Sequence, residues 1–342
     1  MSLSLRLLSL RFAVWTSTLL FLAPLGIAQR YTVTDLGTFP GGSVSQGQAV
    51  NVVGQVVGYA RFANYNAHAF IWTEKTGLVD LGSFPPASNF SVAQGINSLG
   101  EVVGYSDHSD SLNQRAVLWS DGKFRSLGTL PGGDTSLANA INDLGEITGY
   151  SNGTAGVHAV TWDKQGGIRD LNALSGGYSQ GAAINLEGEV AGYSITKNGQ
   201  SHGVLWSKPN GILALPYLSP SDTMASANGI NNLGQVAGGS GNIAVLWQND
   251  QSHTAQSLGT LPGQTWSSAF AINDLTQVVG WSGFIAFVWS PAQGMQNLND
   301  LIPANSGWSL SLPTGINSRG QITGQGTING QQHGFLLTPV EQ

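Results

Sequence analysis

Four of the six histidines occupy the same position in a repeated motif and could therefore share a metal ion. They are His68, His158, His202 and His333, and each stands at the start of an apolar run such as His68-Ala69-Phe70-Ile71-Trp72. A ring of imidazoles would suit zinc only if the fold brought the nitrogen atoms to about 2.0–2.1 Å from one ion. The alternative is a structural role, in which each histidine makes a hydrogen bond where its strand begins.

Other patterns that could support catalysis are weak. The sequence contains no G-x-S-x-G, H-E-x-x-H or P-loop motif. Asp107-His108-Ser109-Asp110 could contact calcium, but calcium takes about 6 to 8 oxygen ligands, and we expect an exposed polar loop here. We therefore assign no catalytic residue, no metal ligand and no cofactor, although carboxylates from different repeats could still pair.

The elements that would position these residues repeat with a period of ~44 residues. An asparagine that follows Ile or Val recurs seven times, and a glycine stands three residues later in every copy except one. These asparagines are Asn51, Asn97, Asn142, Asn185, Asn231, Asn273 and Asn317. Asn-x-x-Gly is typical of a tight turn, and this period predicts one repeat architecture instead of seven separate domains.

Each unit has the pattern of four short strands joined by three tight turns. A strand such as Gln55-Val56-Val57-Gly58-Tyr59 follows the asparagine turn. A connection as short as Ser240-Gly241-Asn242 leads to the Trp-ended strand, and the fourth strand ends on sequences such as Asp80-Leu81-Gly82. Small residues precede the repeated asparagines, which suits a strand crowded against a central axis. Four strands in ~44 residues predict one blade of a β-propeller.

The seventh unit lacks its fourth strand, because too few residues follow Leu337. The matching strand stands at the other end of the chain, as Tyr31-Thr32-Val33-Thr34-Asp35-Leu36-Gly37. We therefore predict an all-β, seven-bladed β-propeller with four antiparallel strands per blade, in which the N-terminal strand closes the last blade. Strands lie roughly 4.8 Å apart within a sheet, so histidines on the third strands of neighbouring blades should be well over ~10 Å apart. This spacing favours the structural role for the histidines.

Aromatic residues that the repeat does not require are the best candidates for ligand binding. Trp266 and Trp308 lie in consecutive connections between blades. Phe90 and Tyr178 stand seven residues before a repeated asparagine, as Trp266 does. Loops on a rigid scaffold often carry function, so we expect these side chains to lie on one face. The alternative is that they fill gaps between blades, and we interpret the repeated tryptophans, with Trp281 at a Tyr position, as core residues.

Composition and charge restrict the cellular setting. Residues 1–28 resemble a secretory signal peptide, so residues 29–342 would form a single mature domain; the alternative is an uncleaved anchor. Charged residues make up only 9% of the chain and the formal net charge is −6, which argues against nucleic acid as a partner. The chain has no cysteine and no further long apolar run. We expect a monomer that is secreted or periplasmic and not embedded in a membrane.

Three motifs together resemble the bacterial extracellular repeats of the HAF family. They are Asp35-Leu36-Gly37-Thr38, Ile96-Asn97-x-x-Gly100-Glu101-Val102-Val103-Gly104-Tyr105 and His68-Ala69-Phe70, and the resemblance covers essentially all of the chain after residue 28. It implies export and a repeat fold, but no activity and no catalytic residue. Later copies have Ile243 and Ile285 in place of His, which argues against a function shared by the histidines.

Three functions remain open. The first is a secreted propeller that binds an extracellular glycan or protein, or serves as a scaffold, through the face that carries Phe90, Tyr178, Trp266 and Trp308. The second is a polysaccharide lyase or hydrolase at the mouth of the pore, which two inward carboxylates about 5 to 9.5 Å apart on that face would favour. The third is a purely structural extracellular repeat. A mouth lined by Ser, Thr, Asn and aromatic residues would favour binding.

Overall fold

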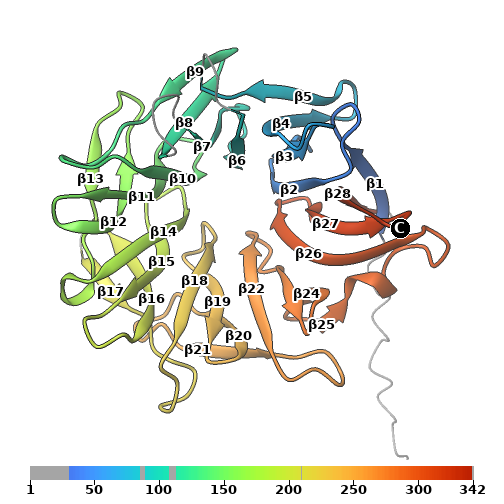
Figure 1. Cartoon of the computed structure of the whole chain (residues 1–342). Coiled ribbons are helices and arrows are strands. Elements are labelled where there is room, and N and C mark those ends of the chain that lie inside the picture. The colour runs from blue at the N-terminus through green and yellow to red at the C-terminus, as the bar shows by residue number, and fades with distance from the viewer. Residues whose placement is uncertain (1–30, 85–88, 108–112, 209, 341–342) are drawn as a thin grey trace, which may run out of the picture.

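The structure is a computed structural model that describes residues 31–84, 89–107, 113–208 and 210–340. It consists of seven four-stranded sheets arranged in a ring around a central axis (Figure 1). The predicted signal peptide, residues 1–28, and residues 108–110 of the calcium candidate lie outside the described part of the chain. The predicted all-β, seven-bladed propeller with four antiparallel strands per blade is confirmed.

Each blade is an antiparallel meander that runs outward from the axis. The innermost strands are β2 (Ser45–Val50), β6 (Ser91–Ile96), β10 (Ser136–Ile141), β14 (Tyr178–Ile184), β18 (Ala225–Ile230), β22 (Ser267–Ile272) and β26 (Trp308–Ile316). The second strands are β3 (Val56–Arg61), β7 (Val102–Asp107), β11 (Ile147–Gly153), β15 (Val190–Ile195), β19 (Val236–Ser240), β23 (Val278–Ser282) and β27 (Ile322–Ile328).

The third strands carry the apolar motif that ends on Trp in six blades. They are β4 (Ala67–Thr73), β8 (Gln114–Ser120), β12 (Gly156–Trp162), β16 (Ser201–Ser207), β20 (Ile243–Trp247), β24 (Ile285–Ser290) and β28 (Gln331–Pro339). The outermost strands are β5 (Gly77–Gly82), β9 (Lys123–Ser126), β13 (Ile168–Asp170), β17 (Gly211–Ala214), β21 (Ala255–Gly259), β25 (Gly294–Asn297) and β1 (Tyr31–Gly37). Two short 3₁₀ turns complete the described structure, η1 (Leu174–Gly176) and η2 (Leu298–Asp300).

The ring is closed by strands from the two ends of the chain, as predicted. β1 pairs antiparallel with β28, in a register that places Tyr31 opposite Pro339 and Asp35 opposite Phe335. In Figure 1 the blue β1 lies at the outer side of the red seventh blade. Tyr31 is only 1% exposed, so this strand contributes to the core as well as to the sheet.

Close packing at the axis explains the small residues before each repeated asparagine. A Cβ atom added at Gly95 would lie 3.0 Å from the Cα atom of Ala140 in the next blade, and one at Gly229 would lie 3.1 Å from the Cα atom of Ala271. Larger side chains would push the innermost strands apart. A β-bulge in every innermost strand re-aims one residue, such as Asn139 between Ala138 and Ala140, toward the channel.

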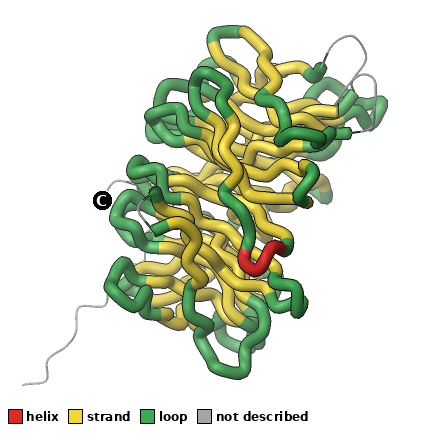
Figure 2. Tube along the Cα trace, turned by 90° about the vertical axis from the view of Figure 1, so that its left-hand side faces the viewer, coloured by secondary structure: helices red, strands yellow, loops and turns green. Residues whose placement is uncertain are grey.

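The hydrophobic core lies between the blades, where the sheet faces pack on one another. In a view from the side, the described chain consists almost entirely of strands and the loops that join them (Figure 2). One cluster joins Val103 and Ala116 of blade 2 to Ile147, Val160 and Trp162 of blade 3. Trp162 and Trp247 are 1% and 0% exposed, which agrees with the interpretation of the repeated tryptophans as core residues.

Candidate functional site

The repeated histidines pair with acids of their own blade and do not converge on one another. His68 Nδ1 lies 3.0 Å from Asp80 Oδ2, and His158 Nδ1 lies 2.9 Å from Asp170 Oδ2. A carboxylate can only accept hydrogen bonds, so the histidine Nδ1–H donates in each pair. Each pair joins a third strand to a fourth strand. The third pair, His333 with Asp35 at 2.9 Å, joins the two ends of the chain.

His202 has a different partner because its blade has Ala214 where the others have the acid. Its ring stacks on Tyr217 with centroids 4.8 Å apart, and Nε2 lies 3.2 Å from the phenol oxygen. Among the described residues, no group of three or more His, Asp or Glu is placed to hold a metal ion. The geometry therefore gives the histidines a structural role, which the sequence favoured, although the sequence did not identify the acids.

The His68–Asp80 pair predicts a stability that depends on pH. Burial by itself raises the pKa of Asp80, but hydrogen bonds from His68 and from the Gly82 N–H outweigh it and hold the pKa below its ordinary value. A carboxyl with a lowered folded-state pKa stabilises the fold above its unfolded pKa of about 3.9, and this contribution is lost as the pH falls through the folded value.

We therefore expect Asp80→Asn to lower the melting temperature modestly at pH 7 and to lose that deficit below about pH 4. Thermal melts of both proteins across this range measure the difference. A deficit that is constant across the range would contradict the assignment.

We also expect His158→Ala to cost stability without changing the metal content of the purified protein, which elemental analysis measures.

The repeated asparagines form a closed ring of hydrogen bonds at one mouth of the channel. Each side-chain Nδ2 donates to the backbone carbonyl of the asparagine in the next blade, over 2.8 to 3.3 Å. The last of these bonds, from Asn317 to the carbonyl of Asn51, closes the circle. Each Oδ1 also accepts the N–H of the residue four places later, such as Gln55. The asparagine thus builds its own turn and joins neighbouring blades.

The mouth beside this asparagine ring is a cavity of about 450 Å³ that contains two acids. Asp143 and Asp274 come from blades three positions apart. Asp143 accepts from the Ser98 N–H at 2.7 Å, and Asp274 accepts from the Asn232 N–H at 2.8 Å. Both acids therefore hold the turn of the preceding blade.

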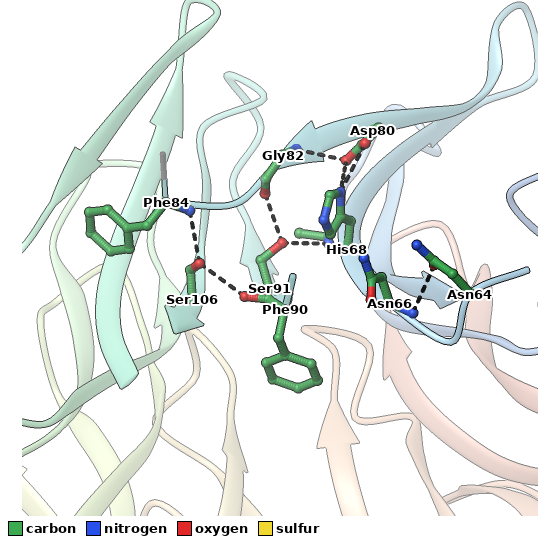
Figure 3. Close-up of polar contacts among 10 residues, drawn as sticks. Asn64, Asn66, His68, Asp80, Gly82, Phe84, Phe90, Ser91 and Ser106 are labelled. Carbon is green, nitrogen blue, oxygen red and sulfur yellow. Dashed lines mark hydrogen bonds and ion pairs between the residues drawn. The ribbon is translucent and has the colours of Figure 1, made fainter. Parts of the chain in front are cut away.

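Serines at two repeated positions also join the blades, and the sequence analysis missed them. Ser91 Oγ accepts the Ala69 N–H of the preceding blade at 2.9 Å and donates to the Gly82 carbonyl at 2.7 Å (Figure 3). Ser106 Oγ accepts the Phe84 N–H at 3.1 Å, which holds the connection between the blades. A serine six residues before the repeated asparagine, as at Ser45, Ser91, Ser136, Ser179 and Ser267, was the available signal.

The four candidate aromatic residues lie on the face opposite the asparagine ring. All four stand at or just before the start of an innermost strand, and every innermost strand ends at the asparagine turn. Phe90 contacts Tyr105 with ring centroids 6.0 Å apart, and Tyr178 contacts Tyr193 at the same distance. Trp266 contacts Trp281 at 5.4 Å. These three therefore share one setting, against the second-strand aromatic residue of their own blade.

Trp308 lies on the same face but in a different setting. Its ring packs on Phe335 of the third strand, with centroids 6.1 Å apart, and it joins the core cluster of blade 7. Gly326 gives it room, because a Cβ atom there would lie 3.1 Å from the Trp308 ring. The gap-filling alternative therefore describes Trp308 better than the other three residues.

Second-strand tyrosines form a row across blades 1 to 4, which we call the tyrosine row: Tyr59, Tyr105, Tyr150 and Tyr193. Burial, together with the nearby phenols of Tyr150 and Tyr59, raises the pKa of Tyr105 to about 12. Burial and Tyr193 raise the pKa of Tyr150 in the same way. The phenols of Tyr105 and Tyr150 stay protonated at neutral pH, so they can exchange hydrogen bonds but are poorly suited to act as general bases.

The tyrosine row ends at blade 5, where Gly239 occupies the position, and a cavity of about 370 Å³ opens there. Trp266 and Trp281 line it together with Met224, Ser226 and Ser268. Its complete lining consists of Ser, Ala, Gly, Asn, Met and Trp, so it holds no charged side chain. Trp281 therefore lines a cavity on the aromatic face, whereas the sequence analysis placed it in the core.

No protein-family model matches the sequence, and no curated protein matches it. Solved structures of low sequence identity share the fold. The extracellular domain of a one-component system of B. thetaiotaomicron is 11% identical, with a TM-score of 0.59 over 92% of this chain. The chain spans 40% of the length of that protein.

A second similar structure is YCF48 bound to D1 peptide. It is 14% identical, with a TM-score of 0.57, and the match covers 92% of this chain and 97% of that one. At these identities the likeness establishes the propeller fold alone. Neither of the 3₁₀ turns, which are the helices of the described residues, has the length or apolarity to span a lipid bilayer.

Proposed function

We propose that this chain is a secreted or periplasmic β-propeller of the HAF-repeat type that acts as a binding module for an extracellular glycan or protein. The observation that carries the proposal is the uncharged, aromatic cavity over blade 5, on the face that bears Phe90, Tyr178 and Trp266. Aromatic side chains offer large, rigid contact areas with a polar edge, which suits both sugars and protein hot spots.

The contrast between the two faces supports this choice. The two acids at the mouth of the asparagine ring, Asp143 and Asp274, accept hydrogen bonds from neighbouring turns and so help to hold the ring together. On the aromatic face, Met224 is 60% exposed and Phe284 is 70% exposed, and Phe284 contacts Trp266 with ring centroids 4.9 Å apart. Exposed aromatic and sulfur-containing side chains beside a cavity are typical of binding surfaces.

Two similar structures are consistent with this proposal. One is an extracellular domain, and the other is bound to a peptide. A lyase or hydrolase would need a base or a pair of carboxylates on the aromatic face. The cavity described there has none, and the phenols of Tyr105 and Tyr150, in blades 2 and 3, have raised pKa values. The lining of this cavity therefore supports binding more than catalysis there.

We expect a triple variant of Phe90→Ala, Tyr178→Ala and Trp266→Ala to lose at least about tenfold in affinity for the partner. The melting temperature should fall only modestly, because the three rings are half-buried and contribute little to the core. Arrays of extracellular glycans and secreted proteins, followed by titration calorimetry on each hit, measure the loss.

The matched control changes three exposed leucines on the opposite face. They lie in the asparagine turns and are 68%, 58% and 63% exposed: Leu99, Leu144 and Leu275. Their replacement by alanine should leave binding unchanged. If the leucine variant lost binding and the aromatic variant kept it, the binding face would be the wrong one.

A further inference from the structure

The cavity over blade 5 is made by departures from the repeat. The second strand has Gly239 where blades 1 to 4 have tyrosine. The innermost strand has Ala225 where five blades have the serine that accepts an N–H group of the preceding blade, as Ser91 does. Both changes remove side-chain volume at the same place. The next blade adds volume, with Trp281 in place of tyrosine and with Trp266, which the repeat does not require. All four departures line one cavity.

The two tryptophans form a right-angled corner of this cavity. Their rings are 5.4 Å apart between centroids, with an interplanar angle of 90°. Phe284 stands against Trp266 at 84° and extends the apolar wall toward solvent. A flat ligand with an apolar face can stack on one indole while its edge meets the other.

The cavity is also lined by polar groups that have no hydrogen-bond partner among the described residues. Ser226 and Ser268 lie on the innermost strands of blades 5 and 6, and their hydroxyls make no hydrogen bond within the described part of the chain. The same holds for the indole N–H groups of Trp266 and Trp281, which are not sealed from solvent. Hydroxyl and indole groups in such a lining can bond a ligand that carries hydroxyls of its own.

We propose, building on the binding function above, that this cavity binds one ring of a neutral sugar within an extracellular glycan. A sugar ring has apolar C–H faces that match an indole, and it has hydroxyls at its edge that match the two serines. The lining carries no charge, so it cannot compensate the charge of an anionic or cationic ligand. An apolar side chain of a protein partner would cover the serine hydroxyls without bonding them, which is unfavourable.

The repeat itself supplies the variant that tests this site. Gly239→Tyr restores the residue of the tyrosine row and fills the cavity without deleting any group. The backbone accepts a side chain here, because a Cβ atom would lie 3.5 Å from Ser268 Oγ and 3.8 Å from the Ile243 carbonyl, which are ordinary contacts. Gly239→Ala is the matched control, since it adds one methyl group and leaves most of the cavity open.

The probes are neutral oligosaccharides of glucose, mannose, galactose, xylose and N-acetylglucosamine, with oligogalacturonate as the anionic probe, each titrated by calorimetry. We expect the wild type to bind a neutral probe more tightly than oligogalacturonate. Gly239→Tyr should weaken that binding at least about tenfold without lowering the melting temperature, and Gly239→Ala should stay within about threefold. Ser226→Ala with Ser268→Ala should also weaken binding, which provides a second variant if Gly239→Tyr does not fold.

Three outcomes would overturn the sugar site. They are equal binding by the wild type and Gly239→Tyr, tighter binding of oligogalacturonate, and no neutral probe bound by the wild type at millimolar concentration. The broader binding function would survive each of them if the triple aromatic variant lost a glycan or protein partner that Gly239→Tyr retained. The proposed binding function itself would fail if the triple aromatic variant bound every partner as tightly as the wild type does.

Discussion

Removal of residues 31–37 is expected to unfold the propeller or to lower its melting temperature by well over 10 °C. This deletion takes away β1, and with it the buried side chains of Tyr31 and Leu36, which are 1% and 4% exposed. The loss of a buried aromatic residue and a buried leucine costs roughly 5 kcal/mol or more, which is comparable to the whole stability of many domains. The deletion also exposes the edge of β28 and removes the His333–Asp35 pair.

Removal of residues 340–342 is the matched control. Val340 is 47% exposed and follows the last residue of β28, so its loss should shift the melting temperature little. Circular dichroism melts of the two truncated proteins measure the contrast. Equal melting temperatures would refute closure of the ring by β1. A synthetic peptide of residues 30–38, added to the first truncated protein, should restore part of the lost stability, because it can occupy the open edge of blade 7.

Replacement of one member of the asparagine ring should have the second largest effect. Asn231 is 3% exposed, and its Nδ2 donates to the Asn273 carbonyl at 3.1 Å and to Gln235 Oε1 at 3.0 Å. Its Oδ1 accepts the N–H groups of Leu233 and Gln235. Asn231→Ala leaves the Leu233 and Gln235 N–H groups without their acceptor, at about 1–3 kcal/mol for each such group, while the Asn273 carbonyl keeps only the Thr276 N–H. We expect a total loss of roughly 2–4 kcal/mol in the free energy of unfolding.

The neighbouring Asn232 provides the control for this prediction. It is exposed, and its side chain accepts the Leu186 N–H at 3.0 Å and donates to Asp274 at 2.9 Å. Asn232→Ala should cost a few tenths of a kcal/mol, as is usual for exposed positions. Urea denaturation of both variants measures the two values. If Asn231→Ala cost no more than Asn232→Ala, neither the turn bonds of the asparagine nor its bond to the next blade would stabilise the ring as proposed.

The fold could be predicted from the sequence because it rests on local and periodic signals. Turn residues such as Asn51 and Gly54 specify where each hairpin reverses, and the hydrogen bond from Gly54 N to the Asn51 carbonyl confirms that turn. The apolar runs specify which strands are buried. The unmatched strand at Tyr31 predicted the closure, because an unpaired sheet edge is unfavourable. The direction of the innermost strands was enough to predict that the four candidate aromatic residues share one face of the ring.

The contacts that define the candidate site depend on tertiary structure. The partner of His68 is Asp80, on the adjacent strand, and a periodic pattern gives no information on which side chains meet across a strand pair. The asparagine ring joins residues 42 to 46 positions apart, or 266 at the closure, and it forms only because seven blades bring these side chains within hydrogen-bond distance. The hydrogen bonds of the repeated serines, such as Ser91 with the Ala69 N–H, also form only because neighbouring blades lie side by side.

The sequence by itself determined the period, the four strands of each blade, the number of blades and the way the ring closes, because these follow from turn chemistry and from burial along each strand. Only the tertiary structure decided what the departures from the repeat achieve. Gly239 and Trp281 are 42 residues apart in the sequence, and their significance lies in the shared cavity over blade 5. The physical reason is that volume removed from one blade becomes a binding cavity only when the neighbouring blade is in place to form its wall.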